Sequence, residues 1–300
     1  MQRELLAHLP VVVAVARHKG FAAAAAALNM SASAVSHAVK VVEDRLGEPL
    51  FARTTRSMSL TESGAQLLST VGAALEDIDA ALETMTAARG TVAGTLKINA
   101  PHTAFAMGLA HLIAKLALTQ PRLVIEVHTS EAFVDIVAEG YDAGIRLGEA
   151  VQQDMVTVRL VDPFVVIMVA SPEYLRVRGE PSTLGELARH NCIGYRLQNS
   201  GSLYEWHVVD AGREVRIATS GSMVITDATS ARELALAGAG IAYAAEPMVR
   251  EDLRAGRLKS ILPAAASHED GLFLYFPRRA SLSPKLRVFI DAAKTRSAGA

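Results

Sequence analysis

The segment Ala32–Leu46 constrains the fold of this 300-residue chain more than any other part of the sequence. Apolar side chains recur along it at helical spacing and predict a buried stripe, formed by Val35, Val39, Val42 and Leu46. Polar side chains recur on the opposite face at the same spacing, at Ser33, Ser36, His37 and Lys40. No carboxylate precedes Glu43 in this segment, whereas a solvated helix face normally includes Glu and Asp. We therefore expect a helix that packs on one face and presents short donors and acceptors on the other.

Two shorter helices are expected before this segment. Pro10 is suited to open a helix through Val11–His18, and the alanine-rich run Phe21–Leu28 strongly favours a second helix. After a short polar break, Ser31 is suited to cap the third helix, and Gly47 is suited to end it. Three helices joined in this way predict a helix-turn-helix.

The polar face of the third helix suits contact with DNA. Small donors and acceptors near a helix N-terminus fit base edges in the major groove, and the cation of Lys40 fits a phosphate. Residues 1–60 hold seven Lys and Arg against four acids, a balance that permits a nucleic-acid partner without proving one. The pattern leaves one alternative open, an ordinary solvated helix face.

A β-hairpin is expected directly after the third helix. Its apolar arms contain Leu50, Phe51, Met58 and Leu60, and its polar tip carries Arg53, Thr54 and Arg56. A basic hairpin tip beside a helix-turn-helix can contact the DNA backbone or the minor groove.

A long helix without proline is expected from the N-cap candidate Thr61 to about Arg89. Apolar residues recur in it with strict heptad spacing, at Leu68, Val71, Leu75, Ile78, Leu82 and Met85. So narrow a stripe is typical of a helix that pairs with a partner helix, because a helix on a globular core carries a wider one. We therefore predict dimerisation through this seam, with packing inside one chain as the alternative.

Composition excludes several classes of protein. Half of the residues are apolar and 20% are charged, which excludes a disordered chain. The single cysteine, Cys192, excludes a disulfide framework and a multi-cysteine metal site, and we expect neither a cofactor nor a metal ion. No apolar run reaches the roughly 18 residues that a membrane span needs. With no membrane partner and no leader pattern, the expected compartment is the cytoplasm.

Beyond a glycine-containing hinge at 90–94, strands and helices alternate and predict a parallel sheet built from βαβ units. The first part is expected to contain strands at 95–99, 123–129 and 143–147 and helices at 105–118 and 132–139. Further strands are expected at 156–159, 164–170, 240–244 and 272–277, with helices at 230–237 and 284–294.

Polar residues follow several of these expected strands, where ligands gather in open α/β sheets. The candidate effector-binding residues are Ala100, His102, Thr103, Thr129, Ser130, Arg146, Ser202, Asp227 and Glu246. The planar guanidinium of Arg146 suits a carboxylate, so we expect a small anionic ligand, with pairing of Arg146 to Glu149 or another local acid as the alternative. Tyr204 and Trp206 lie near one of these segments, either as core residues or as ligand-stacking groups.

The N-terminal residues resemble the DNA-binding domain of LysR-type transcriptional regulators. The match rests on five ordered segments, Phe21–Leu28, Ser31–Ser36, Glu43–Gly47, Leu50–Arg53 and Leu60–Gly64. The resemblance implies an α/β protein with a winged helix-turn-helix, a long linker helix and a two-lobed effector domain of periplasmic-binding-protein type. The corresponding division is 1–60 for the DNA-binding domain, 61–90 for the linker and hinge, and 91–300 for the effector domain. In that domain lobe I spans 91–162 and 266–300, and lobe II spans 163–265.

The resemblance also implies residue roles. Ala32, Ser33, Ser36 and His37 fall where the family's recognition helix contacts DNA, and Arg53 and Arg56 fall in its wing. Two positions depart from the family. Ala22 stands where Ser or Thr usually caps the second helix and contacts a phosphate, and His37 stands where Arg or Gln is common.

The sequence therefore predicts a sequence-specific DNA-binding regulator and not an enzyme, since zinc-protease, Walker and serine-hydrolase motifs are missing. Its expected partners are double-stranded DNA, a small effector and further copies of itself, as a homodimer or homotetramer. One alternative is a DNA-binding protein whose body only oligomerises. A second is a solute receptor or enzyme with an appended helix-turn-helix.

Overall fold

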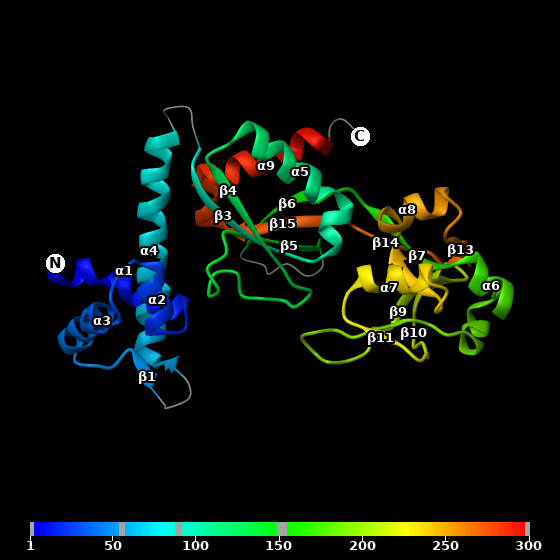
Figure 1. Cartoon of the computed structure of the whole chain (residues 1–300), viewed down its shortest axis with the longest axis horizontal. Coiled ribbons are helices and arrows are strands. Elements are labelled where there is room, and N and C mark those ends of the chain that lie inside the picture. The colour runs from blue at the N-terminus through cyan, green and yellow to red at the C-terminus, as the bar shows by residue number, and fades with distance from the viewer. Residues whose placement is uncertain (1–2, 54–57, 88–91, 149–154, 298–300) are drawn as a thin grey trace. The chain divides into compact units, whose positions relative to one another are not determined.

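The computed structural model of the chain describes residues 3–53, 58–87, 92–148 and 155–297 (Figure 1). The chain forms two compact units. The N-terminal unit holds Met1–Thr91, with Val137–Gly140 and Leu282–Pro284 grouped with it. The C-terminal unit holds Val92–Ile136, Tyr141–Ser281 and Lys285–Ala300.

The N-terminal unit is a helix-turn-helix followed by a hairpin and a long helix, as expected. Its elements are α1 (Arg3–Arg17), α2 (Phe21–Ala27), α3 (Ala32–Leu46), β1 (Phe51–Arg53), antiparallel β2 (Met58–Leu60) and α4 (Glu62–Ala87). Only α1 differs clearly from the prediction, because it begins before Pro10 and contains it. Among the described residues no single helix is long and apolar enough to cross a membrane. The helical segments Leu5–Arg17 and Phe21–Ala27 reach that length and hydropathy only when they are taken together, and a bend of 118° separates them.

Capping and alanine packing define the helix-turn-helix. The Ser31 hydroxyl accepts a hydrogen bond from the Ala34 amide at 3.2 Å, and Gly47 ends α3 with a left-handed φ of 77°, which glycine adopts without strain. The core combines valines with small alanines, which let the helices approach closely: Val11, Val12, Val15, Ala24, Ala25, Val35, Ala38, Val39, Val42, Leu50 and Phe51. The prediction that Leu46 is buried is wrong, since its side chain is 45% exposed. Leu50 and Phe51, after the turn, complete the core in its place.

The larger sheet of the C-terminal unit has the strand order β4-β3-β5-β15-β6. These strands span Leu123–Thr129, Gly94–Ala100, Ala143–Leu147, Leu272–Pro277 and Met155–Val161. β3 pairs in parallel with β4 and β5, but β15 pairs antiparallel with β5 and β6, so the expected parallel sheet is mixed. Helices α5 (Ala110–Thr119) and α9 (Pro284–Ser297) pack on this sheet through one continuous apolar core (Figure 1).

The helix expected at 105–118 is divided. Phe105–Leu109 forms a π-helical turn, and α5 continues from Ala110. Gly108 lies in the turn with a φ of 112°, a conformation that the helical pattern alone did not predict.

The smaller sheet is built around β7 (Phe164–Ala170), which pairs antiparallel with β12 (Ala242–Ala245), β13 (Lys259–Ile261) and β14 (Ser267–Glu269). Both faces of β7 are covered, because Ile167 and Val169 belong to one apolar cluster and Met168 and Ala170 to another. The surrounding strands are β8 (Gly194–Tyr195), β9 (Trp206–Asp210), β10 (Arg213–Ile217) and β11 (Val224–Ile225). The helices are α6 (Pro172–Arg178), α7 (Ala228–Leu236) and α8 (Glu246–Arg254), with 3-10 turns at Leu184–Arg189, Pro263–Ala265 and Arg278–Leu282.

The helix expected at 132–139 does not form, and this prediction is wrong. The segment consists of bends and turns. Its backbone groups bond elsewhere: the Ala132 carbonyl accepts from Arg146, and the Phe133 amide and carbonyl both bond to the Asn199 side chain. Tertiary hydrogen bonds thus replace the helical ones.

A buried carboxylate joins α7, α8 and the turn that follows. Asp252 is fully buried, and its two oxygens accept from two arginines. Oδ2 accepts from Arg232 at 2.6 Å, and Oδ1 accepts from Arg257 Nε at 2.9 Å and Nη2 at 2.5 Å. Such paired, charge-assisted bonds compensate the cost of burying the carboxylate.

Replacing this carboxylate should destabilise the C-terminal unit. We expect Asp252→Asn to lower the free energy of unfolding by about 3 kcal/mol, because Arg257 loses its counter-charge and Arg232 keeps only its pair with the exposed Glu233. Urea unfolding followed by the fluorescence of Trp206, the chain's single tryptophan, measures the change. Glu173→Gln is the control, since it breaks only the exposed pair with Arg176 and should leave the transition unchanged. Equal urea midpoints for the wild type and Asp252→Asn would show that Asp252 does not stabilise the C-terminal unit.

Candidate functional site

The α3 helix presents the predicted polar face to solvent. Val35, Val39 and Val42 are buried, whereas Ser33, His37 and Lys40 are exposed. Ala32 is also exposed and Ser36 is half-buried, so the structure brings all five predicted α3 residues onto the accessible side of the helix.

Glu43 has a role that the sequence pattern did not reveal. Its Oε1 accepts hydrogen bonds from the amides of Leu50 at 2.8 Å and Phe51 at 3.3 Å, which fixes the start of the hairpin against α3. Because this carboxylate faces the hairpin, Asp44 is the acid that α3 exposes in its last turn. The first three turns of the exposed face therefore combine hydroxyls, an imidazole and an ammonium without an acid.

The hairpin forms with the predicted strands. Phe51 pairs with Leu60 and Arg53 pairs with Met58 in the antiparallel register. Thr54 and Arg56 lie outside the described residues, and for Arg53 the structure describes the backbone. The DNA-binding role of these three residues stays a prediction.

The predicted seam on α4 divides into two halves. Leu68 packs against the helix-turn-helix core, and Val71 and Leu75 are half-buried. Ile78, Leu82 and Met85 are 55%, 58% and 72% exposed. A row of exposed large apolar side chains at heptad spacing is a surface suited to a second helix.

The C-terminal unit contains a cavity of about 280 Å³ between residues of the two sheets. Two of the predicted effector residues, Thr103 and Arg146, line it. The cavity wall is otherwise mostly apolar and aromatic, and three of the chain's six tyrosines and its single tryptophan contribute to it: Tyr195, Tyr204, Trp206 and Tyr243. Sequence reasoning had noted Tyr204 and Trp206 without assigning them, and it missed Tyr195 and Tyr243. The clustering of these aromatic residues between positions 195 and 243 was the available signal.

The other predicted effector residues do not line this cavity. Ala100 is buried at the end of β3, Thr129 is exposed at the end of β4, and the Ser130 hydroxyl accepts from the Ala132 amide. The remaining four have local partners: His102 with Glu131, Ser202 with Ser200, Asp227 with Ser230 and Glu246 with Arg250.

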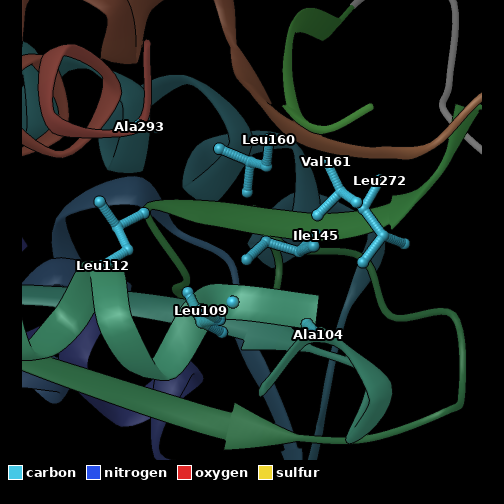
Figure 2. Close-up of a pocket in the computed structure, with 9 residues that line it drawn as sticks. Ala104, Leu109, Leu112, Ile145, Leu160, Val161, Leu272 and Ala293 are labelled. Carbon is cyan, nitrogen blue, oxygen red and sulfur yellow. The ribbon is translucent and has the colours of Figure 1, made fainter. Parts of the chain in front are cut away.

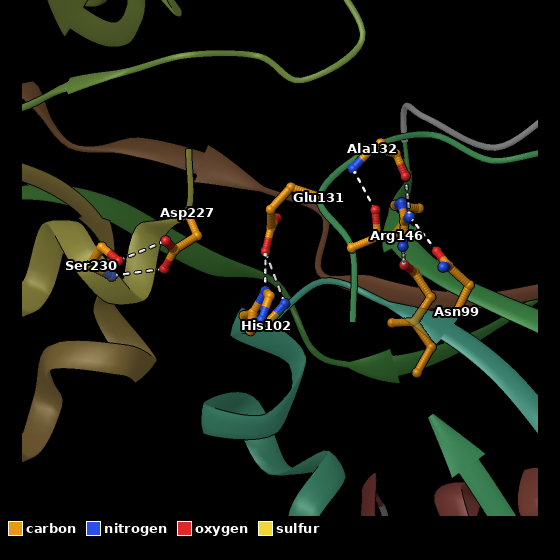
Figure 3. A network of polar contacts seen from close by, with 9 residues as sticks. Asn99, His102, Glu131, Ala132, Arg146, Asp227 and Ser230 are labelled. Carbon is orange, nitrogen blue, oxygen red and sulfur yellow. Dashed lines mark hydrogen bonds and ion pairs between the residues drawn. The ribbon is translucent and has the colours of Figure 1, made fainter. Parts of the chain in front are cut away.

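Arg146 is the central polar residue of the cavity and is only 5% exposed. Figure 3 shows its guanidinium beside Asn99 and Ala132. It donates to the Ile145 carbonyl at 2.6 Å, to Asn99 Oδ1 at 2.5 Å and to the Ala132 carbonyl at 2.6 Å. Burial lowers the pKa of this guanidinium from its usual value, although an arginine remains protonated at neutral pH.

Glu131 forms a separate polar group at the cavity wall. Its carboxylate accepts from the His102 amide at 2.9 Å and lies 3.3 Å from His102 Nδ1, as Figure 3 shows. Burial and the nearby Glu131 carboxylate raise the pKa of Tyr195. Tyr195 therefore stays a neutral phenol at the edge of the cavity.

The aromatic wall is held in fixed geometry. Trp206 and Tyr243 stack with ring centroids 5.3 Å apart and an interplanar angle of 15°, and Tyr204 stacks on Tyr243 at 6.4 Å. The Tyr243 hydroxyl is anchored by the His207 carbonyl and by Ser267 Oγ at 2.6 Å. Burial raises the pKa of Tyr243 to about 12, so its ring too is neutral.

A second, much smaller cavity of about 20 Å³ lies beside Gly108 (Figure 2). Its lining is apolar and includes Leu109, Leu112, Ile145 and Leu160. A cavity this small and apolar offers no hydrogen-bonding groups to a ligand, and we interpret it as imperfect packing around the π-helical turn.

The chain is similar to known regulatory proteins along nearly all of its length. Residues 6–65 match the bacterial regulatory helix-turn-helix protein, lysR family, and residues 89–298 match the LysR substrate binding domain. The chain is 38% identical over 282 residues to the HTH-type transcriptional regulator YcaN of Escherichia coli strain K12, covering 94% of this chain and 92% of that protein.

Solved structures show the same relationship. CrgA, a LysR-type transcriptional regulator from Neisseria meningitidis, matches with a TM-score of 0.63 and 30% identity over 96% of this chain and 98% of its own. Full-length LysG from Corynebacterium glutamicum, solved with bound effector Arg, shares the fold with a TM-score of 0.64, 17% identity and coverage of 96% and 98%.

A pair of hydrogen bonds joins Asn199 to Phe133, a residue of the larger cavity's wall. Asn199 Oδ1 accepts from the Phe133 amide at 2.7 Å, and Asn199 Nδ2 donates to the Phe133 carbonyl at 3.1 Å. The Phe133 ring centroid lies 5.6 Å from the Arg146 guanidinium, so Asn199 helps to hold this ring beside the cation. We refer to the Asn199–Phe133 pair as the latch.

Removing the latch should expose the Phe133 backbone. We expect Asn199→Ala to raise the hydrogen-exchange rate of the Phe133 amide about 2- to 10-fold, since a net hydrogen bond contributes about 0.5–1.5 kcal/mol. Exchange measured on fragments covering residues 131–136 tests this. Ser200→Ala is the control, because the Ser200 hydroxyl contacts only Ser202 among the described residues. Unchanged exchange in Asn199→Ala would show that the latch does not protect this segment.

Proposed function

The chain belongs to the LysR family of transcriptional regulators, which are not enzymes, and from that premise we propose how it recognises DNA and senses an effector. The exposed face of α3, whose first three turns contain no acid, carries the proposal for DNA. Ala32, Ser33, Ser36 and His37 contact base edges in the major groove, and Lys40 contacts a phosphate. In the wing, Arg53, Thr54 and Arg56 contact the DNA backbone or the minor groove.

Two copies of the chain bind together in this proposal. The exposed Ile78, Leu82 and Met85 continue the seam that begins at Leu68, and a second α4 would cover them. Dimeric helix-turn-helix proteins read sites with two-fold related halves, so we expect a palindromic operator. The assembly is a homodimer or a homotetramer of such dimers, and it acts in the cytoplasm, where its operator lies.

The effector in this proposal is a small anion bound in the cavity of about 280 Å³, where it modulates DNA binding or activation. We propose a division into lobe I, 91–162 with 266–300, and lobe II, 163–265. Membership of the two sheets supports this division except at β14, which falls in lobe I by these bounds but pairs with β7 of the smaller sheet. Ligand cavities occur preferentially between such lobes. The built, aromatic-lined cavity favours effector binding over a body that serves only in oligomerisation.

Substitutions on α3 test the division of labour in DNA binding. We expect Lys40→Ala to weaken binding to all DNA sequences. It should also reduce the slope of log affinity against log salt concentration by about 1, as the loss of one phosphate contact requires. His37→Ala should instead change the preference at one base pair by about 1–3 kcal/mol. Fluorescence anisotropy with the chain's upstream DNA and with random duplexes measures both. Equal losses on specific and random DNA for both variants would overturn the assigned roles.

Substitutions on α4 test the dimer seam. Ile78→Asp should shift the chain from dimer to monomer at micromolar concentration, because it places a charge in a desolvated seam. Ser69→Asp is the matched control, since it introduces the same charge on the exposed outer side of α4. Sedimentation velocity measures the species present. A dimer that survives Ile78→Asp unchanged would show that α4 is not the pairing surface.

A further inference from the structure

Three features of the larger cavity restrict the chemistry of its ligand: one buried cation, two wall carboxylates and a stacked aromatic wall. We infer that the effector is a single-ring aromatic monocarboxylate, with its carboxylate at Arg146 and its ring against the aromatic wall. This inference rests on the proposed effector site and narrows the ligand class.

Arg146 is a buried cation that forms no ion pair within 4 Å among the described residues. The charge of Glu131 acts on it from farther away and raises its pKa against the effect of burial, and Glu149 lies outside the described residues. Its three hydrogen bonds go to neutral oxygens, on Asn99, Ala132 and Ile145, and its Nε has no partner although it is buried. A guanidinium has five N–H donors, so three acceptors leave it incompletely satisfied. Burying a charge in this state is costly unless an anion compensates it, and a planar carboxylate matches the guanidinium fork.

A second partnerless group lies near this cation. The hydroxyl of Tyr275 is buried without a hydrogen-bond partner among the described residues. Burial raises its pKa, and the nearby Arg146 charge partly opposes that rise. Two unsatisfied polar groups in one buried region are unusual in native structures. Arg146, unlike Tyr275, lines the cavity, so its incompletely satisfied guanidinium is the group that a ligand there can complete.

The charges of the cavity wall limit the ligand to one carboxylate. Among the described residues Arg146 is the only cation that lines the cavity, whereas Glu131 and Glu269 both contribute to the wall. Glu131 already accepts from His102 and so needs no cationic ligand group. A second ligand carboxylate would have no cationic partner in the described wall and would be repelled by Glu131 and Glu269.

The remaining wall favours a planar ring. Tyr195, Tyr204, Trp206 and Tyr243 form connected stacked and edge-to-face contacts, and such surfaces bind a further ring in offset or edge-to-face geometry. Met107 and Met248 add polarisable thioethers to the lining. The cavity volume of about 280 Å³ lies near the lower end of ligand pockets, roughly 300–1,000 Å³, which favours one ring over a fused system.

Matched pairs of acids test the ring. We expect benzoate or phenylacetate to bind the full-length chain at least about tenfold more tightly than cyclohexanecarboxylate or cyclohexylacetate, which carry the same charge on a non-planar ring. Benzamide, which is planar but neutral, should bind as weakly as the two cyclohexyl acids. Calorimetric titration gives the affinities, and Trp206, the chain's single tryptophan, reports ring contact through its fluorescence.

Variants locate the ligand in the cavity. Arg146→Gln should weaken benzoate or phenylacetate binding at least about tenfold, and Arg146→Lys should restore part of the loss, because it keeps the charge without the planar fork. Tyr204→Leu should weaken binding, whereas Tyr204→Phe, which keeps the ring, should not. Circular dichroism and Trp206 emission confirm that each variant is folded.

The possible results separate this inference from the proposed function. Equal or tighter Arg146-dependent binding of the cyclohexyl acids, or of succinate, would overturn the aromatic monocarboxylate and leave an anionic effector site in place. If no carboxylate binds the folded wild type in an Arg146-dependent way, both the inference and the anionic effector are wrong. The proposed DNA-binding function is judged separately by the Lys40 and His37 variants.

Discussion

A buried guanidinium joins three parts of the C-terminal unit that are distant in sequence. Arg146 projects from β5, donates to Asn99 on the neighbouring β3, and donates to the Ala132 carbonyl in the irregular segment that follows β4. The Ala132 carbonyl therefore bonds to Arg146 in a segment that forms bends and turns instead of a helix. The same contacts thus determine the local fold and place the cation at the cavity.

The irregular segment also connects the cavity to the smaller sheet. Phe133 covers Arg146 with its ring and bonds through its backbone to Asn199, which lies beyond β8. Two exposed hydrogen bonds contribute about 1–3 kcal/mol in total. That is similar to the coupling free energies of about 1–3 kcal/mol that link two sites in allosteric proteins. The latch is therefore weak enough for a ligand of modest affinity to open or reinforce it, since a ligand shifts an equilibrium only by its differential affinity.

The sequence predicted those parts of the fold that depend on local patterns. The α3 bounds, the Ser31 cap and several strands follow from side-chain periodicity and turn residues, and the structure has them where expected. The features it did not predict depend on distant partners. The irregular segment near Ala132 needs Arg146 and Asn199, the inward turn of Glu43 needs the hairpin amides, and β15 enters the larger sheet from more than a hundred residues away. Tyr195 and Tyr243 were missed for the same reason, because each reaches Tyr204 in the aromatic wall only after folding.

Two buried charges in this unit show how a structural charge differs from one that marks a binding site. Asp252 is fully buried, yet two arginines and short hydrogen bonds satisfy both of its oxygens, so its burial needs nothing further. Arg146 is buried to almost the same extent, but neutral oxygens satisfy only part of it, and its Nε has no hydrogen-bond partner among the described residues. Since an incompletely satisfied buried charge is costly, we interpret Arg146 as a group that a ligand carboxylate completes. The aromatic wall beside Arg146 gives that ligand its shape, which is why the cation and the rings are interpreted together as one site.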